Sequence, residues 1–198
     1  MASGIILAGG ASSRMGRDKL SLTVGGVPLI RRVYDVLSSH CAELLVAGAA
    51  DRLPEIPVAR TVEDLRPGRE GPLAGIETGL TAARYSLVFV AAADLPFLPA
   101  DLVGYSLTLL TRERVSVVAP RHEGLHPLCA AYDRAILPQV SAALDTGERS
   151  VTRFIRGLRG VRFVEGEELS RFGEPEFFLM NVNSPEDLER ARACGGVE

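Results

Sequence analysis

Short apolar runs alternate with longer amphipathic stretches along this chain of 198 residues. Most of the apolar runs lack polar alternation, which is typical of strands covered on both faces, as in a parallel sheet between two layers of helices. The runs predict strands at Gly4–Ala8, Leu44–Ala47, Val58–Val62, Leu87–Ala93, Val115–Ala119, Val161–Val164 and Phe177–Met180. We therefore expect an α/β fold, a three-layer α/β/α sandwich with a Rossmann-like, mostly parallel sheet.

Helical periodicity fills the intervals between these runs. In the first interval, Leu29, Val33 and Leu37 fall on one helical face. Comparable patterns complete a predicted set of helices at Pro28–Ser38, Pro72–Ala83, Pro99–Leu110, Arg134–Leu144 and Pro185–Ala193. Because the alternation covers the whole chain without a repeat or a linker, we expect residues 1–198 to form a single domain.

Charge and cysteine content exclude several classes of function. A formal net charge of -3 argues against a general affinity for nucleic acid, which needs an excess of Lys and Arg. The longest apolar run, Leu87–Ala93, falls far short of the roughly 20 residues that cross a bilayer, and no export signal is visible. Cys41, Cys129 and Cys194 form no CxxC pair, so neither a disulfide framework nor a zinc site is indicated. We expect a soluble, cytoplasmic protein without nucleic-acid or membrane partners.

A glycine-rich segment follows the first predicted strand, at the sheet edge where α/β folds bind ligands. It reads LAGGASSRMGRDK from Leu7 to Lys19. Gly9 and Gly10 let main-chain N–H groups approach phosphate oxygens, while Arg14 and Lys19 supply the positive charge that a triphosphate needs. The spacing matches neither the GxxxxGK[ST] nor the GxGxxG pattern. We interpret the segment as a phosphate-binding loop rather than a plain strand-to-helix turn with surface charges.

This loop resembles the LAGGxSxRMGxDK signature of the molybdenum cofactor guanylyltransferases, the MobA family of Rossmann-like nucleotidyltransferases. The resemblance covers nearly the whole chain. It implies a Mg²⁺-dependent transfer of GMP from GTP to molybdopterin, with or without bound molybdenum, and release of pyrophosphate. It also implies that Leu7, Ala8, Gly9, Gly10 and Lys19 bind GTP, and that Arg14 and Lys19 act in catalysis by offsetting phosphate charge.

Asp94 ends the most apolar predicted strand, and Leu95-Pro96 then turns the chain away. A carboxylate at a strand end can hold Mg²⁺ against phosphate oxygens, because this hard cation prefers oxygen ligands. The resemblance implies that Asp94 is the metal ligand, a catalytic residue and part of the GTP site. The alternative is an aspartate that caps the next helix.

Two segments resemble family positions close to the nucleotide. The GPLAG sequence from Gly71 to Gly75 matches a segment beside the base, and Asp64, seven residues before Gly71, matches a GTP-binding aspartate. Guanine offers N–H donors that a carboxylate can accept. Helix capping and close packing are the alternative for both glycines. Family members often carry an Asn after the second strand, and Val46–Asp51 has none, so we assign no base contact there.

Two other segments resemble the acceptor side of the family. Asn181 and Asn183 lie in an NVNSPEDL sequence, where alternation puts both side chains on one face and Ser184 is an expected helix N-cap. His126 opens the sequence HPLCAAY. The resemblance implies that Asn181, Asn183 and His126 bind the acceptor. Turn chemistry for the asparagines and a purely structural role for His126 remain alternatives.

Three rival functions fit parts of this pattern. Molybdenum cofactor cytidylyltransferases tend to read LAAG in the loop, so Gly10 and the GPLAG segment favour guanine. Other metabolite nucleotidyltransferases share the loop but fit the HP and NVNSPEDL segments less well. A noncatalytic GTP-binding protein that delivers the cofactor would not need Lys19 together with Asp94. For the enzyme, molybdoenzyme-maturation proteins are candidate partners.

Overall fold

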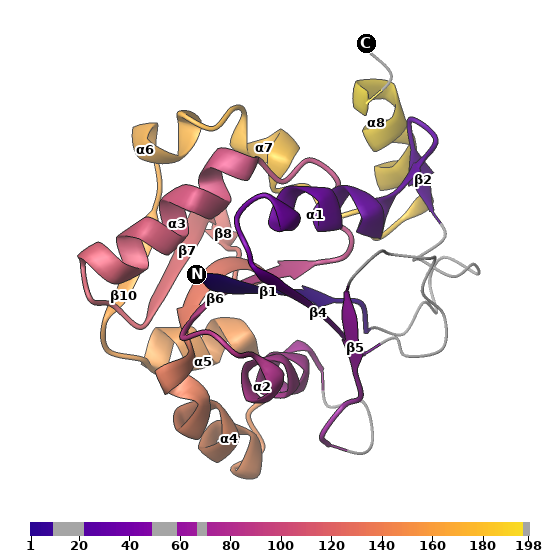
Figure 1. The fold of residues 1–198 in the computed structure, drawn as a ribbon. Coiled ribbons are helices and arrows are strands. Elements are labelled where there is room, and N and C mark those ends of the chain that lie inside the picture. Colours follow the sequence, from indigo (N-terminus) through magenta and orange to yellow (C-terminus); the bar gives the residue numbers. More distant parts are fainter. Residues whose placement is uncertain (10–21, 49–58, 67–70, 196–198) are drawn as a thin grey trace.

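A single β-sheet forms the centre of the computed structural model, which describes residues 1–9, 22–48, 59–66 and 71–195 (Figure 1). The order along the sheet is β10-β7-β9-β6-β1-β4-β5, and β8 pairs with β7. These strands are β1 (Ala2–Leu7), β4 (Glu43–Ala47), β5 (Arg60–Val62), β6 (Leu87–Ala92), β7 (Val117–His122), β8 (Gly124–Leu125), β9 (Cys129–Asp133) and β10 (Val161–Val164).

Most strand pairs within the sheet are parallel. Strand β1 lies between β4 and β6, with Leu7 opposite Ala47 on one side and Ala92 on the other. Strand β5 continues the parallel half beyond β4, and β10 runs parallel to β7 at the far end. Among the described strands of this sheet, β8 and β9 break the pattern, because both pair antiparallel with their neighbours. The carboxyl ends of β1, β4, β5 and β6 therefore share one edge of the sheet.

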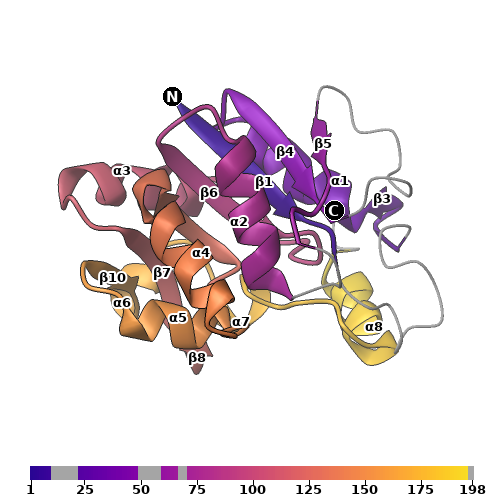
Figure 2. The same cartoon turned by 90° about the horizontal axis from the view of Figure 1, so that it is seen from below.

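Helices cover both faces of the sheet, which explains why the strands are apolar throughout. In β1, Ile6 packs into the core on one face, while Ile5 and Leu7 pack into the core on the other. The first core includes residues of α1 (Leu29–Ser38), α3 (Ala100–Arg112), α6 (Glu167–Ser170) and α7 (Pro175–Phe178). The second includes residues of α2 (Pro72–Ala82), α4 (Leu137–Asp145) and α5 (Val151–Gly157), which lie below the sheet in Figure 1 and in front of it in Figure 2. The predicted three-layer α/β/α sandwich is confirmed.

A third, smaller apolar cluster lies beside the first core. It joins the hairpin of β2 (Thr23–Val24) and β3 (Val27–Pro28) to α8 (Pro185–Gly195), which lie next to each other in Figure 1. Val24, Leu29, Val182 and Leu188 are buried in it. Helix α8 therefore packs against Leu22 and Val24, which lie shortly after the glycine-rich segment in the sequence.

Several predicted elements differ from the structure. Phe177–Met180 is not a strand: residues Pro175–Phe178 form the short helix α7, with proline in its first turn. The predicted helix over Arg134–Leu144 begins as a 3-10 turn at Arg134–Ile136 and becomes α-helical only from Leu137. Strand β9 and the helices α5 and α6 were not predicted, and Val58 lies outside the described residues. In the described part of the chain, no helix is long and apolar enough to cross a membrane.

Candidate active site

The candidate site begins at the end of β1, where hydrogen bonds to residues on both sides fix the main chain. The Ala8 N–H donates to the Ala47 carbonyl at 2.9 Å, and the Ala93 N–H donates to the Leu7 carbonyl at 3.0 Å. Gly9 follows and is exposed. The predicted phosphate-binding residues Gly10, Arg14 and Lys19 lie outside the described residues.

Gly48, which directly follows β4, packs against Gly9. An ideal Cβ at Gly48 would lie 2.8 Å from the Gly9 Cα atom, so no side chain fits between the two backbones. Gly48 also has a φ of +90°, a conformation that L side chains rarely adopt. The sequence analysis did not predict that Gly48 packs against Gly9. The available signal was a glycine directly after a predicted strand, at the edge of the sheet where ligands bind.

Asp94 occupies the turn after β6, beside the end of β1, and is 9% exposed. Its main-chain carbonyl accepts a hydrogen bond from the Val182 N–H at 3.0 Å. The next helix, α3, has Pro99 as its N-cap and no side-chain cap hydrogen bond. The capping role considered as the alternative for Asp94 is therefore wrong, and its carboxylate stands at the carboxyl edge of the sheet.

The surroundings of Asp94 suit a Mg²⁺ ion that takes some of its oxygen ligands from a bound nucleotide. Within the described residues, no group of three or more His, Cys, Asp or Glu side chains could hold a metal ion. A single carboxylate is nevertheless the usual protein contribution to a Mg²⁺ site in which phosphate oxygens and water complete the octahedron. The described donor set thus fits Mg²⁺ bound together with a nucleotide.

The Asn181–Asn183 segment lies next to Asp94 through the hydrogen bond from Val182. Val182 is fully buried in the third cluster, Asn181 is half-buried and Asn183 is exposed. The predicted N-cap is confirmed, because the Asp187 N–H donates to Ser184 Oγ at 3.1 Å. The Asp187 carboxylate in turn accepts from the N–H groups of Asn183 and Ser184, at 3.0 and 2.9 Å. This capping box fixes the main chain of the segment next to Asp94.

The His126 segment reaches the same edge by way of β9. The Leu128 carbonyl accepts from the Ala92 N–H at 2.8 Å, which places the segment at the end of β6. His126 is half-buried, and its Nε2 atom lies 3.1 Å from the His122 carbonyl oxygen. Burial lowers the pKa of His126, so the imidazole is neutral at pH 7. This state suits hydrogen bonding better than charge stabilisation.

The base-side residues lie at the end of β5 and at the start of α2. Asp64 is exposed two residues beyond β5, and Gly71 is the N-cap of α2 with a φ of +80°. An ideal Cβ at Gly75 would lie 3.1 Å from Leu7 Cδ2, so Gly75 lets α2 pack closely on the end of β1. The geometry therefore supports the packing and capping functions of both glycines, and it places them at the predicted edge.

The structure thus collects the described candidate residues along one edge of the sheet, with the base-side residues at β5 and α2 and the acceptor-side residues next to the end of β6. Open α/β sheets bind ligands at this edge. Glycines that expose main-chain N–H groups and a carboxylate at the neighbouring strand end are features of a nucleotide-binding transferase.

Comparisons with known proteins agree with this class. Residues 4–162 match the MobA-like NTP transferase domain. The chain is 36% identical to the probable molybdenum cofactor guanylyltransferase of Pelotomaculum thermopropionicum, over 96% of this chain and 92% of that protein. It is 35% identical to the molybdenum cofactor guanylyltransferase of Cereibacter sphaeroides, over 96% and 95% of the two chains. The chain belongs to the MobA-like NTP transferase family.

A solved structure supports the fold. The crystal structure of molybdopterin-guanine dinucleotide biosynthesis protein A from Archaeoglobus fulgidus matches with a TM-score of 0.85 and 24% identity, covering 99% of this chain and all of that one. The predictions of an α/β nucleotidyltransferase and of the molybdenum cofactor guanylyltransferase family, both made from the sequence, are confirmed.

Proposed function

We propose that residues 1–198 form one catalytic unit that transfers GMP from GTP to molybdopterin, with or without bound molybdenum. The products are molybdopterin guanine dinucleotide and pyrophosphate. One observation carries the proposal beyond the family: main-chain hydrogen bonds join the end of β1 to Ala93, next to Asp94, and join Asp94 to Val182 in the Asn181–Asn183 segment. A donor and an acceptor bound on the two sides of Asp94 would place their phosphates next to each other.

Two groups of residues divide the binding work in this proposal. GTP is held by residues of the loop, of the segment after β5 and of the start of α2: Leu7, Ala8, Gly9, Gly10, Lys19, Asp64, Gly71, Gly75 and Asp94. The acceptor is held by His126, Asn181 and Asn183. Support comes from the described members of the two sets. The GTP set lies around the ends of β1, β5 and β6, while the acceptor segments reach the end of β6 through the bonds from the Ala92 N–H to the Leu128 carbonyl and from the Val182 N–H to the Asp94 carbonyl.

The reaction we infer is an in-line attack by the terminal phosphate of the acceptor on the α-phosphorus of GTP. The nucleophile is already an anion, so the residues need to position two polyanions and offset their repulsion. Main-chain N–H groups of the loop orient the triphosphate, while Arg14 and Lys19 offset its charge. Asp94 would hold Mg²⁺, which when bound neutralises charge on the phosphate oxygens.

We place the reaction in the cytoplasm and infer that molybdoenzyme-maturation proteins receive the product. A reducing compartment suits the thiols of Cys41 and Cys129, which are both buried. Burial raises the pKa of each thiol to about 12, so both are protonated and inert at neutral pH.

A ligand panel tests the proposal. The purified protein is melted with GTP, CTP, ATP or UTP, each with and without Mg²⁺, and pyrophosphate release is then measured with molybdopterin. A nucleotide at 1,000 times its Kd should stabilise the fold by about 4 kcal/mol. We expect selective, Mg²⁺-dependent stabilisation by GTP, followed by pyrophosphate release.

Each other outcome favours a rival function. Selective stabilisation by CTP would identify a cytidylyltransferase with the same mechanism. Binding of GTP without pyrophosphate release would identify a noncatalytic GTP-binding protein. No response to any nucleotide would contradict the assignment of the loop after β1.

A further inference from the structure

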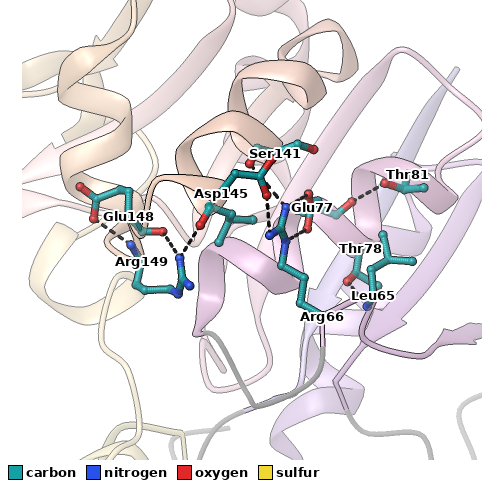
Figure 3. Close-up of polar contacts among 10 residues, drawn as sticks. Leu65, Arg66, Glu77, Thr78, Thr81, Ser141, Asp145, Glu148 and Arg149 are labelled. Carbon is teal, nitrogen blue, oxygen red and sulfur yellow. Dashed lines mark hydrogen bonds and ion pairs between the residues drawn. The ribbon is translucent and has the colours of Figure 1, made fainter.

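The segment 64–71 joins β5 to α2, and it therefore lies at the sheet edge where we propose that GTP binds. Four of its residues, Asp64, Leu65, Arg66 and Gly71, are described. Its start contacts side chains of α2 and α4 (Figure 3), and its end lies close to the connection between α4 and α5.

Arg66 fixes the start of the segment by a two-pronged ion pair with Glu77 of α2 (Figure 3). Arg66 Nε lies 2.6 Å from Glu77 Oε2, and Arg66 Nη2 lies 2.9 Å from Oε1. The third guanidinium nitrogen, Nη1, lies 2.8 Å from Asp145 Oδ1 at the end of α4. We refer to Arg66, Glu77 and Asp145 as the Arg66 clamp.

The neighbouring residue is fixed in the same way. The Leu65 N–H donates to Thr78 Oγ1 at 3.1 Å, so two consecutive residues of the segment bind two consecutive residues of α2. Asp64 directly precedes this anchored pair and is itself exposed. The position of its main chain is therefore set by Leu65 and Arg66.

The burial of Glu77 distinguishes the Arg66 clamp from an ordinary surface ion pair. The Glu77 side chain is 7% exposed, and the buried face of this helix otherwise holds apolar residues such as Leu73, Ile76 and Leu80. Five polar or charged residues are buried among those that the structure describes, and Glu77 and Thr78 are two of them. A buried carboxylate is costly unless it is paired, and here both buried groups bind the segment that carries Asp64.

The other end of the segment lies against the connection between α4 and α5. An ideal Cβ at Gly71 would be 3.8 Å from the Arg149 carbonyl oxygen. Arg149 is itself anchored, because its Nη1 donates to the Leu144 and Glu148 carbonyls at 2.8 and 3.0 Å. Asp145 at the end of α4 thus contacts the segment directly at Arg66, and the turn that follows α4 lies close to Gly71.

We propose that the Arg66 clamp holds Asp64 in its position toward bound GTP, so that Arg66 and Glu77 are positioning residues that set nucleotide affinity. The inference rests on the proposed function, and it adds a specific support for the base-side half of the site. A binding group that is fixed in advance loses less freedom when the ligand binds.

Steady-state pyrophosphate release tests the clamp, with GTP and molybdopterin titrated separately. In Arg66→Gln and Glu77→Gln we expect the KM for GTP to rise about tenfold, while kcat and the KM for molybdopterin change less than about twofold. Arg66→Lys keeps the charge and loses the planar fork, so its KM for GTP should lie between those of the wild type and Arg66→Gln.

Arg162→Gln is the matched control. Arg162 Nη2 contacts both carboxylate oxygens of Glu168 at 2.7 Å, and its exposure of 31% is close to the 23% of Arg66. It lies on β10, at the opposite end of the sheet from β5. We expect a similar loss of thermal stability in this variant, with an unchanged KM for GTP.

A double variant separates positioning from general damage. Because Arg66 and Glu77 act as one unit, Arg66→Gln/Glu77→Gln should raise the KM for GTP no further than Arg66→Gln alone.

Three outcomes would overturn the clamp alone: multiplicative effects of the two substitutions on the KM for GTP, an unchanged KM for GTP in folded Arg66→Gln, or an equal rise of the KM values for both substrates. A wild-type protein that neither binds GTP nor releases pyrophosphate would overturn the proposed function as well. If Arg66→Gln fails to fold, Asp145→Asn at the exposed partner and Arg66→Lys provide the same comparison.

Discussion

Gly9 and Gly48 show how single residues determine the candidate site. Their backbones pack together where β1 and β4 end, and no Cβ fits at Gly48. Main-chain N–H groups can approach a ligand only where side chains leave room. The close contact therefore leaves the main chain at Gly9 free of neighbouring side chains at Gly48, while the hydrogen bonds of Ala8 and Ala93 fix the direction in which the chain leaves β1.

Replacing Gly48 with alanine should damage both stability and nucleotide binding. The new Cβ would approach Gly9 within 2.9 Å in a backbone conformation with φ of +90°, which costs roughly 1–3 kcal/mol. Denaturant unfolding and GTP titration measure the two effects. Gly124→Ala is the control, because nothing lies within 4 Å of its ideal Cβ. Equal GTP affinity in the two variants would contradict the role of Gly48.

Asp94→Asn and Lys19→Ala should each reduce turnover by at least roughly 100-fold, since each removes a charged group from the proposed phosphate site. The melting temperature should change little, and circular dichroism checks the fold. Asp101→Asn, an exposed aspartate in the first turn of α3, is the matched control. Nearly full pyrophosphate release by either Asp94→Asn or Lys19→Ala would remove the assigned role of that residue.

The ion pair between Glu77 and Arg66 should contribute a pH-dependent part of the stability. The hydrogen bonds from Arg66 lower the pKa of Glu77, outweighing its burial. Its stabilisation is therefore complete above the ordinary glutamate pKa of about 4.3 and is lost as the pH falls through the lower pKa of the folded state. The difference in unfolding free energy between wild type and Glu77→Gln should stay constant from about pH 7 to about pH 5 and narrow below about pH 4. A difference that does not vary with pH would contradict this assignment.

At the scale of elements, the small cluster around α8 links the two sides of the site. Leu22 and Val24 follow the glycine-rich segment directly, and they share this cluster with Val182 and Leu188. The Val182 N–H donates to the Asp94 carbonyl, and Arg192 Nε donates to the Thr23 carbonyl at 3.2 Å. Helix α8 therefore packs against residues 22–24, which lie shortly after the glycine-rich segment, and the segment before α8 binds the turn of Asp94.

Leu188→Ala should weaken GTP binding as well as stability. Truncating a buried leucine costs about 2–5 kcal/mol, and here the loosened packing would reach Leu22 and Val182. We expect a Kd for GTP that rises severalfold in isothermal titration. Leu169→Ala, a fully buried leucine of α6 in the first core, should cost comparable stability and leave the Kd unchanged. A common effect of both variants on the Kd would show that the α8 cluster has no special link to the site.

The sequence predicted some strands correctly and failed for other elements. The apolar runs of β1, β4, β6 and β10 were long or regular enough to identify strands within about two residues at either end. Residues Phe177–Met180 misled because a run of four apolar residues fits a strand and a buried helical turn equally well. Strand β9, with the sequence CAAYD, was missed because small residues without β-branching give a weak strand signal.

At the scale of the whole molecule, strand β9, which the sequence did not predict, determines how the His126 segment reaches the candidate site. Strand β9 inserts antiparallel between β6 and β7, and its start brings the His126 segment to the end of β6. That pairing joins residues about 40 positions apart, which no local pattern reveals. The position of Asp94 followed from the strand-end rule, and that of the Gly71–Gly75 segment from its resemblance to the family. The contact of Gly9 with Gly48 and the Arg66 clamp depend on tertiary packing, so they became visible only in the structure.

We therefore expect the edge of the sheet to divide into a nucleotide half, at the ends of β5, β4, β1 and β6, and an acceptor half, around the His126 and Asn181–Asn183 segments. Hydrogen exchange with mass spectrometry should reveal this division. GTP with Mg²⁺ should slow exchange of the N–H groups of Ala8 and Ala93, which sit at the strand ends of the nucleotide half. Adding molybdopterin should extend the protection to Cys129 and Val182, whereas β10 should exchange unchanged as the internal control. Protection of β10 by GTP alone would indicate a global stiffening instead of two adjoining sites, and would argue against Asp94 as the boundary between donor and acceptor.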